Sequence, residues 1–447
     1  MNARVNRRGS AQERLAESLA RIADPASEGA RACVSVYERS ARAEAVAADE
    51  RNRLGLSLGP LDGVIVSIKD LFDVAGDITR AGSAVVQAEG KPAPRDAEVV
   101  RRLRAGGAIV VAKTNMSELA FSGVGTNPHL GTPGNPLDRS LVPGGSSSGA
   151  AVAVADGFCE VAIGTDTGGS VRIPAALCGL TGFKPSRAAV PTDGAFPLSE
   201  TLDAIGPIAR SVAECAAAYD VLSGTSRDID ALEPEGLRLG IVTGLPFRDI
   251  APEVEAGFAS AIAALSSAGM RIVSLDLPEI EEMRLLNART GGLVAAEAYS
   301  VHQGRAARFA DMDPNIAARI EKGAAVSAAT YIELLRERRR LIASFERHWE
   351  RFDVLAMPTV PITAPTIAEV ADPARFADRN LLLLRNTAIG NFFDWPAISL
   401  PISHAGTVCG ISIMARPDAD RRLLAVATGV EAALAGTGML YKTGDWK

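Results

Sequence analysis

The chain has 447 residues, 47% of them hydrophobic and 22% charged, a composition that excludes a disordered, collagenous or coiled-coil protein. Its formal net charge is −6, with no long run of one sign, which argues against a nucleic-acid partner because such partners bind basic surfaces. The five cysteines form no CxxC pair. Their pattern argues against a disulfide framework or a zinc site and fits a reducing compartment.

The N-terminal residues lack an apolar stretch of signal-peptide length, and 15–22 are typical of a short amphipathic helix. No run of about 18 apolar residues occurs anywhere in the sequence, so no membrane partner is expected. These patterns predict a cytoplasmic protein. No feature of the sequence reports on its oligomeric state, which leaves a homo-oligomer open.

Strand and helix patterns alternate along the chain. In chain order, strands are predicted at 64–68, 108–112, 238–242, 271–275, 354–357, 397–402 and 410–414. Helices are predicted at 15–22, 96–104, 211–222, 252–268 and 327–350. Ser211 and Glu214 have the spacing of a capping box at the start of the third of these helices.

This alternation predicts the α/β class, with a single large domain in which helices cover a central mixed, mostly parallel β-sheet. We expect residues 1–55 to form a helical segment packed on the core, and 56–447 to form the main domain. Within that domain, the functional core is expected at about 60–210.

Two polar, glycine-rich loops interrupt the pattern, Pro143–Gly149 (PGGSSSG) and Gly164–Ser170 (GTDTGGS). A helix over 148–157 advances about 15 Å, and a strand over 160–164 returns about 16 Å, so both loops reach one edge of the sheet. Lys69 follows the strand at 64–68, again at its carboxyl end. Open α/β sheets bind their ligands at that edge.

Ser146, Ser170 and Lys69 are therefore expected to meet there, a set that suits nucleophilic catalysis without histidine. A serine hydroxyl needs a base to take its proton. A lysine is a base only when neutral, and burial among 64–68 lowers its pKa from about 10.4. Gly168 and Gly169 allow backbone N–H groups to hold an oxyanion, which is worth about 3–4 kcal/mol for each donor.

In these motifs the chain resembles the amidase signature family. The resemblance spans roughly residues 30–430 and is strongest from 60 to 210. It rests on the 24-residue spacing of the two serines together with the lysine block, a specific combination. The matching blocks are Pro60–Val64, Ile68–Asp73, Ala112–Glu118, Gly144–Gly149 and Gly164–Ala175.

The resemblance implies the amidase signature fold for 56–447 and a Ser–cis-Ser–Lys triad. Ser170 would attack the amide carbonyl and form an acyl-enzyme, and Ser146, after a cis peptide, would relay protons to and from Lys69. The implied oxyanion hole and acyl pocket consist of the backbone amides of Thr167, Gly168, Gly169 and Ser170, with Met116 in the pocket.

The reaction implied is hydrolysis of a linear carboxamide to a carboxylate and ammonia or an amine. The substrate would be a small molecule, with no metal and no cofactor. Within the family the alternative is the glutaminase subunit of an aminoacyl-tRNA amidotransferase, which works with partner subunits. That alternative requires an acid that recognises glutamine, whereas the matching position falls near Leu384. The sequence therefore favours a free-standing amidase.

Two further hypotheses concern the loop Pro143–Gly149. Gly145–Gly149 also satisfies GxSxG, the nucleophile elbow of α/β-hydrolases, which would make Ser147 the nucleophile of a serine esterase. That chemistry needs a later histidine, for which the candidates are His302, His348 and His404. A phosphate-cradling loop is disfavoured, because no Walker lysine follows it.

The remaining polar and aromatic residues have less specific predictions. Asp70 and Asp73 are interpreted as solvated turn residues, and Asp166 as hydrogen-bonded within its own loop. Arg172 either binds a substrate carboxylate or forms an ion pair. The far wall of the pocket is expected from 300–340 and 384–395. Three aromatic residues are either core or an aryl subsite: Phe392, Phe393 and Trp395.

Overall fold

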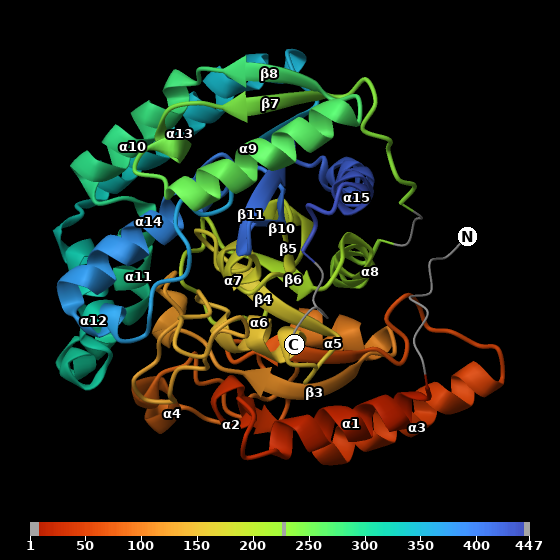
Figure 1. Cartoon of the computed structure of the whole chain (residues 1–447). Coiled ribbons are helices and arrows are strands. Elements are labelled where there is room, and N and C mark those ends of the chain that lie inside the picture. Colours follow the sequence, from red (N-terminus) through yellow and green to blue (C-terminus); the bar gives the residue numbers. More distant parts are fainter. Residues whose placement is uncertain (1–8, 226–228, 442–447) are drawn as a thin grey trace.

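A computed structural model describes residues 9–225 and 229–441, and a single twisted sheet crosses it (Figure 1). Its eleven strands are ordered β1-β3-β2-β4-β6-β5-β10-β11-β9-β7-β8. The strands are β1 Cys33–Val36, β2 Ile65–Lys69, β3 Ile109–Thr114, β4 Val161–Asp166, β5 Thr181–Lys184, β6 Ala204–Ala209, β7 Arg238–Val242, β8 Arg271–Leu275, β9 Val354–Pro358, β10 Ala397–His404 and β11 Thr407–Met414.

The sheet is mixed, as predicted, but the expectation that it is mostly parallel is wrong. Four of the ten strand pairs among the described residues are parallel, two around β2 and two around β7. The other six are antiparallel. The predicted strands include neither β5 nor β6, which enter the middle of the sheet antiparallel to their neighbours. β10 and β11 form an antiparallel hairpin through Ala405 and Gly406, both at positive φ.

Helices cover both faces of this sheet. They are α1 Ala11–Ala23, α2 Gly29–Ala32, α3 Glu38–Arg53, α4 Ala84–Glu89, α5 Glu98–Ala105, α6 Ser148–Ala155, α7 Arg172–Leu177, α8 Val212–Ser223, α9 Pro252–Ser267, α10 Pro278–Thr290, α11 Leu293–His302, α12 Pro314–Glu321, α13 Ala328–Glu346, α14 Pro373–Phe392 and α15 Asp420–Gly436. The long helix predicted at 327–350 ends in a 3₁₀ turn at Arg347–Glu350.

Side-chain alternation along β2 assigns its residues to two cores. Val66 and Ile68 pack with residues of α5, α8, α9 and α15 in one cluster. Ile65 packs with residues of α1, α3 and α6 in another, on the opposite face. Because successive side chains of a strand point to opposite faces, Lys69 lies on the same side of the sheet as Ile65. The final residue of β2 is therefore directed toward α6.

The cap of α8 differs in one detail from the predicted capping box. The Ser211 hydroxyl accepts a hydrogen bond from the Glu214 amide at 3.3 Å, as expected. The Glu214 carboxylate, however, accepts from the amide of Arg210 at 3.0 Å. In a capping box the Glu214 carboxylate would accept from the amide of Ser211, whereas here it accepts from the amide one residue earlier. The amides of Arg210 and Glu214 both have acceptors.

The N-terminal segment contributes a strand as well as helices. α1 packs on α3, and α3 packs on β3, while β1 pairs antiparallel with β3 and forms one edge of the sheet. The division of the chain at residue 55 stays a prediction.

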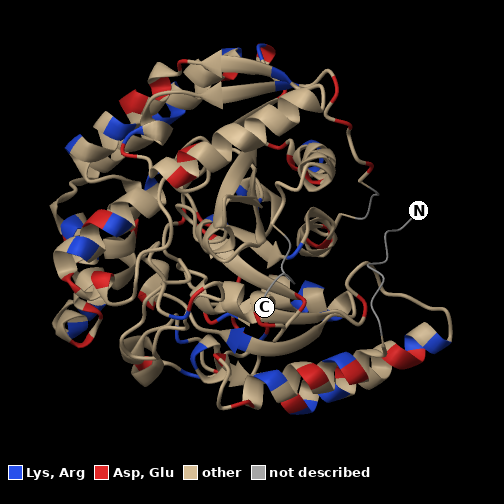
Figure 2. Ribbon diagram, in the orientation of Figure 1, with Lys and Arg blue, Asp and Glu red and all other residues tan. Residues whose placement is uncertain are grey.

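Many charged side chains lie on the outer helices of the molecule (Figure 2). Figure 2 shows Lys and Arg interspersed with Asp and Glu along α1, α3 and the helices of the second half, whereas the central strands carry few charges. No helix among residues 9–225 and 229–441 is long and apolar enough to cross a membrane.

Candidate active site

The lysine and the two serine loops meet at one edge of the sheet, as the sequence predicts. β2 and β4 are parallel neighbours, so their carboxyl ends lie side by side. Lys69 is the last residue of β2, and the glycine-rich loop with Ser170 follows β4. Ser146 lies two residues before the start of α6, which packs on both strands.

The Lys69 ammonium group lies within hydrogen-bond distance of two hydroxyls. Its Nζ is 2.8 Å from Ser146 Oγ and 3.0 Å from Thr165 Oγ1. The peptide bond between Gly145 and Ser146 is cis. The amide of Ser147 donates to the Ser170 carbonyl oxygen at 3.3 Å, which joins the two loops through their backbones.

Burial changes the acid–base character of Lys69. Its side chain has no exposed surface, and this desolvation lowers its pKa to about 7, although the carboxylates of Asp203 and Asp166 oppose the shift. The ordinary pKa of a lysine is near 10.4. At neutral pH a large share of Lys69 is therefore the free amine, which can accept a proton from Ser146.

Four consecutive backbone N–H groups border Ser170. The amides of Thr167, Gly168, Gly169 and Ser170 have no hydrogen-bond acceptor among the described residues. Gly169 has a φ of +136°, a backbone conformation that L side chains rarely adopt. The Gly168 carbonyl oxygen faces the other way, where it accepts from Thr387 Oγ1 of α14 at 2.6 Å. This arrangement suits a site for negative charge on an oxygen atom.

A buried ion pair supports the loop from behind. The Arg172 guanidinium donates to both oxygens of Asp166, at 2.8 and 3.0 Å, and to Asn391 Oδ1 at 2.6 Å. Although burial opposes it, Arg172 holds the pKa of Asp166 down at about 2. Asp166 is hydrogen-bonded within its loop, as predicted, and of the two hypotheses for Arg172 the structure has the ion pair.

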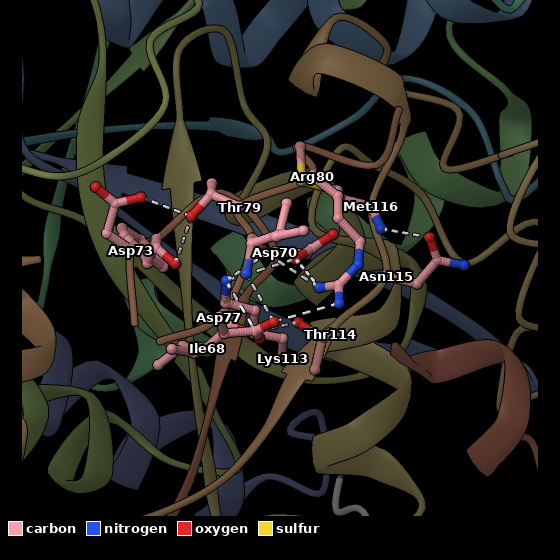
Figure 3. A network of polar contacts seen from close by, with 12 residues as sticks. Ile68, Asp70, Asp73, Asp77, Thr79, Arg80, Lys113, Thr114, Asn115 and Met116 are labelled. Atoms are coloured by element: carbon pink, nitrogen blue, oxygen red, sulfur yellow. Dashed lines mark hydrogen bonds and ion pairs between the residues drawn. The ribbon is translucent and has the colours of Figure 1, made fainter. Parts of the chain in front are cut away.

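Asp70 was expected to be a solvated turn residue, and that prediction is wrong. Its side chain is fully buried, 3.8 Å from Lys113 Nζ and 3.3 Å from the Arg80 guanidinium (Figure 3). Burial raises its pKa to about 6, against the two cations. Asp77 joins the same network, whereas Asp73 is half-buried and accepts from Thr79 at 2.6 Å. The network holds the segment that follows Lys69 against β3.

A cavity of about 310 Å³ opens beside Ser170. Thr167, Gly168 and Ser170 form its polar end. Its far wall contains the expected segments, since Arg319 and Lys322 lie within 300–340 and four residues of α14 lie within 384–395. The wall also includes residues that were not predicted, from Asn287 to Ala295.

Two predictions for individual lining residues have separate outcomes. Leu384, near which the acid of the amidotransferase alternative is expected from the sequence, lies in the cavity wall. Met116 is fully buried and is not among the described residues of that wall, so its role in an acyl pocket stays a prediction. Of the three aromatic residues, Phe392 lines the cavity, whereas Phe393 and Trp395 stack in the core beside Phe345.

Two of the histidines named for the elbow hypothesis are engaged elsewhere. His302 stacks on Phe196, and His348 Nε2 lies 3.2 Å from Glu279. Ser147 Oγ is buried and lies 3.5 Å from the carbonyl oxygen of Thr165. The contacts of Ser147 thus involve the backbone of the β4 loop.

Thr165 and Asp203 were not predicted as site residues, and Arg319 and Thr387 were predicted only as members of the segments 300–340 and 384–395, not as individual residues. Thr165 lies within the motif GTDTGGS, and this glycine-rich motif could have indicated it as a site residue. Asp203 accepts from Thr167 Oγ1 at 2.5 Å and from the amides of Leu198 and Ser199, contacts that no local pattern indicates. Arg319 in α12 and Thr387 in α14 are far in sequence from the serine loops. A single polar residue in a helix does not by itself indicate a functional site.

Comparisons with known proteins identify the family of the chain. The Amidase family profile matches residues 13–424. The 2-amino-5-chloromuconic acid deaminase of Comamonas testosteroni is 38% identical over 408 residues, covering 89% of this chain and 87% of the relative. A Glutamyl-tRNA(Gln) amidotransferase subunit of Streptomyces avermitilis is 34% identical over 462 residues, covering 93% and 90%. A crystal structure of an amidase has a TM-score of 0.83 at 32% identity, covering 95% of this chain and 96% of that one.

The chain belongs to the amidase family. It is an enzyme that hydrolyses carbon–nitrogen bonds other than peptide bonds.

Proposed function

We propose that the enzyme hydrolyses a small linear carboxamide through an acyl-enzyme on Ser170, with Lys69 as the base and Ser146 as the proton relay. The observation that carries this proposal is the 2.8 Å contact between Lys69 Nζ and Ser146 Oγ, made by a buried lysine with a pKa of about 7. A base that is half neutral at the working pH is well suited to proton transfer.

In the first half-reaction Lys69 takes the proton of Ser146, and Ser146 takes that of Ser170. Ser170 Oγ attacks the amide carbon, and the N–H groups of 167–170 stabilise the oxyanion. When the C–N bond breaks, the proton returns from Lys69 through Ser146 to the leaving nitrogen. Ammonia or an amine departs, and the acyl group stays on Ser170.

In the second half-reaction water attacks the ester carbon. The water gives its proton to Lys69 through Ser146, and Ser170 recovers a proton as the ester bond breaks. The carboxylate product leaves, and the enzyme is restored. Every step uses side chains of this chain, without a metal or a cofactor.

We also propose a cytoplasmic location. All five cysteines are buried free thiols. Unpaired thiols fit a reducing compartment, where disulfides are rare.

The test is chemical labelling combined with two substitutions. Because Ser170 supplies the nucleophile and Lys69 the base, Ser170→Ala and Lys69→Ala each lower kcat by about 1000-fold or more, with the thermal midpoint near that of the wild type. A fluorophosphonate probe labels Ser170, and the control variant Ser147→Ala still reacts with it. Labelling at Ser147, or substantial turnover by Ser170→Ala, would contradict the proposal.

The similarity to the amidotransferase relatives keeps glutaminase as the second candidate function. Ammonia release from glutamine, with the purified chain alone and beside a panel of aliphatic, aryl, dicarboxylic and ureido amides, separates the two. We expect turnover of panel amides by the chain alone. Turnover of glutamine only in the presence of a partner protein would establish the alternative.

A further inference from the structure

The cavity beside Ser170 has a one-sided charge. Two cationic side chains, Arg319 of α12 and Lys322 just beyond it, belong to its wall, and the described lining contains no Asp or Glu. Most of the remaining wall is hydrocarbon and includes the side chains of Phe121, Leu293 and Phe392. A cavity of this kind favours a ligand with an apolar body and a negative charge.

Arg319 differs from Arg172 and Arg338 because its guanidinium has neither a carboxylate nor a carbonyl acceptor among the described residues. Arg172 is bonded to Asp166, and Arg338 donates to the carbonyl oxygen of Phe392 at 2.7 Å. No carboxylate among the described residues lies within ion-pair distance of Arg319, and its Nε is buried without a hydrogen-bond partner. A buried polar donor without an acceptor is costly, so this guanidinium is poised for an acceptor from a ligand.

The orientation of Arg319 leaves its donors available. Its Cζ lies 4.3 Å from the ring centroid of Phe121, so the ring supports the flat guanidinium by a cation–π contact. Burial lowers the pKa of Arg319 to about 10, which still leaves it charged at neutral pH. A guanidinium held by its face presents N–H groups at its edge, in the geometry that binds a carboxylate with two hydrogen bonds.

We propose that the substrate is the monoamide of a dicarboxylic acid with a hydrocarbon spacer, and that Arg319 binds its free carboxylate while Ser170 attacks the amide. The assignment rests on the proposed function of Ser170. Lys322, exposed at the cavity wall, adds positive charge near the entrance. An ammonium group finds no carboxylate in the described wall, and Leu384 contributes hydrocarbon there, so the cavity selects against amino-acid amides.

The first experiment compares matched substrates. Monoamides of dicarboxylic acids with four to eight carbons are assayed beside branched alkanamides in which an isopropyl group replaces the carboxylate. Glutaramate is assayed beside L-glutamine, which differs from it only by the α-ammonium group. The wild-type enzyme is expected to prefer the carboxylate member of the best pair by about 10-fold or more in kcat/KM, and glutaramate over glutamine.

The second experiment substitutes the arginine. Arg319→Met keeps an apolar side chain against Phe121 and removes the charge. Arg319→Lys keeps the charge and loses the paired N–H donors of the planar guanidinium. For the best carboxylate substrate, Arg319→Met is expected to lower kcat/KM by about 10- to 100-fold, mainly through KM, with partial rescue in Arg319→Lys. The neutral isostere keeps its kcat/KM. Arg336→Met, at an exposed arginine of α13 outside the cavity, is the control and leaves both substrates unchanged.

A binding measurement makes the result independent of turnover. Calorimetry with Ser170→Ala follows the binding of the carboxylate substrate, with and without Arg319→Met, and a Kd about 10-fold weaker or more in the double variant supports the proposal. A preference for the neutral isostere, or equal losses on both substrates in Arg319→Met, would overturn the carboxylate assignment and leave the Ser170 mechanism standing. Turnover that survives Ser170→Ala would overturn the proposed function, while the calorimetry still decides the role of Arg319.

Discussion

The acid–base properties of individual residues in the site depend strongly on the groups packed around them. Lys69 is an ordinary amine until the sheet and α6 exclude water from it, and burial then lowers its pKa to about 7. The Asp203 carboxylate opposes this shift and also accepts a hydrogen bond from Thr167, so one side chain influences both Lys69 and the loop that contains Ser170. In the proposed mechanism Asp203 is thus a positioning residue for both the base and the oxyanion hole.

The rate of hydrolysis should depend on pH through Lys69. Below pH 7 the lysine is protonated and cannot accept a proton from Ser146, so kcat/KM falls about tenfold for each further pH unit. Above pH 7 the amine is free, and the rate reaches a plateau. A kcat/KM profile from pH 5 to 9 with one amide substrate measures this, and a profile flat down to pH 5 would contradict a lysine base.

Removal of the Asp203 charge should shift the acid limb of this profile, the pH range below 7 in which kcat/KM falls. Since a negative carboxylate stabilises the ammonium form of Lys69, Asp203→Asn lowers the pKa of the lysine, and the limb shifts to lower pH. Thr167→Val is the matched control, because it removes the hydrogen bond between Thr167 and Asp203 without changing the charge. A limb that moves equally in both variants would show that the hydrogen bond, rather than the charge, sets the pKa.

At the scale of elements, helices from the second half of the chain shape a loop from the first half. α14 reaches the loop after β4 through Thr387, which binds Gly168, and through Asn391, which binds Asp166. α12 brings Arg319 to the same cavity. In the proposed mechanism the serine motifs supply the reacting atoms, while helices distant in sequence hold the loop and form the cavity wall.

Gly169→Ala tests the fit between the loop and α14. A Cβ at this glycine would lie 2.1 Å from Thr387 Oγ1 and 2.7 Å from Ile173 Cδ1, so the loop must move. We expect kcat to fall about 100-fold, because displaced N–H groups no longer meet the oxyanion. Gly59→Ala is the control: its φ is +147°, and nothing lies within 4 Å of the added carbon. Equal activity of Gly169→Ala and Gly59→Ala would show that catalysis does not depend on the position of this loop.

At the scale of the whole molecule, buried charges connect elements that are far apart in sequence. Asp166 at the end of β4, Arg172 at the start of α7 and Asn391 near the end of α14 form one hydrogen-bonded group with no exposed charge. The Asp70 and Lys113 network does the same for β2 and β3 (Figure 3). Removing one partner of such a group leaves the other as an unpaired buried charge.

Arg172→Met should accordingly destabilise the fold by about 3–5 kcal/mol, since Asp166 loses its cation. Denaturant unfolding measures the free energy, and the double variant Arg172→Met with Asp166→Asn recovers part of the loss. Arg53→Met is the control, at an exposed pair with Glu50 on α3, and leaves the unfolding midpoint unchanged. A loss no larger than that of the control would mean that the buried pair contributes little.

The sequence by itself determined the α/β class, most of the predicted strands and the positions of Lys69, Ser146 and Ser170 at one edge of the sheet. These features depend on local patterns, namely apolar periodicity, glycine-rich turns and the lengths of one helix and one strand. It did not determine that β5 and β6 enter the sheet antiparallel, that Asp70 is buried, that Arg319 is the side chain of 300–340 without an ionic partner at the cavity, or that Thr387 binds the Gly168 carbonyl oxygen. Each of those depends on which distant segments pack together, and packing is decided by the burial of the whole chain rather than by any neighbouring residues.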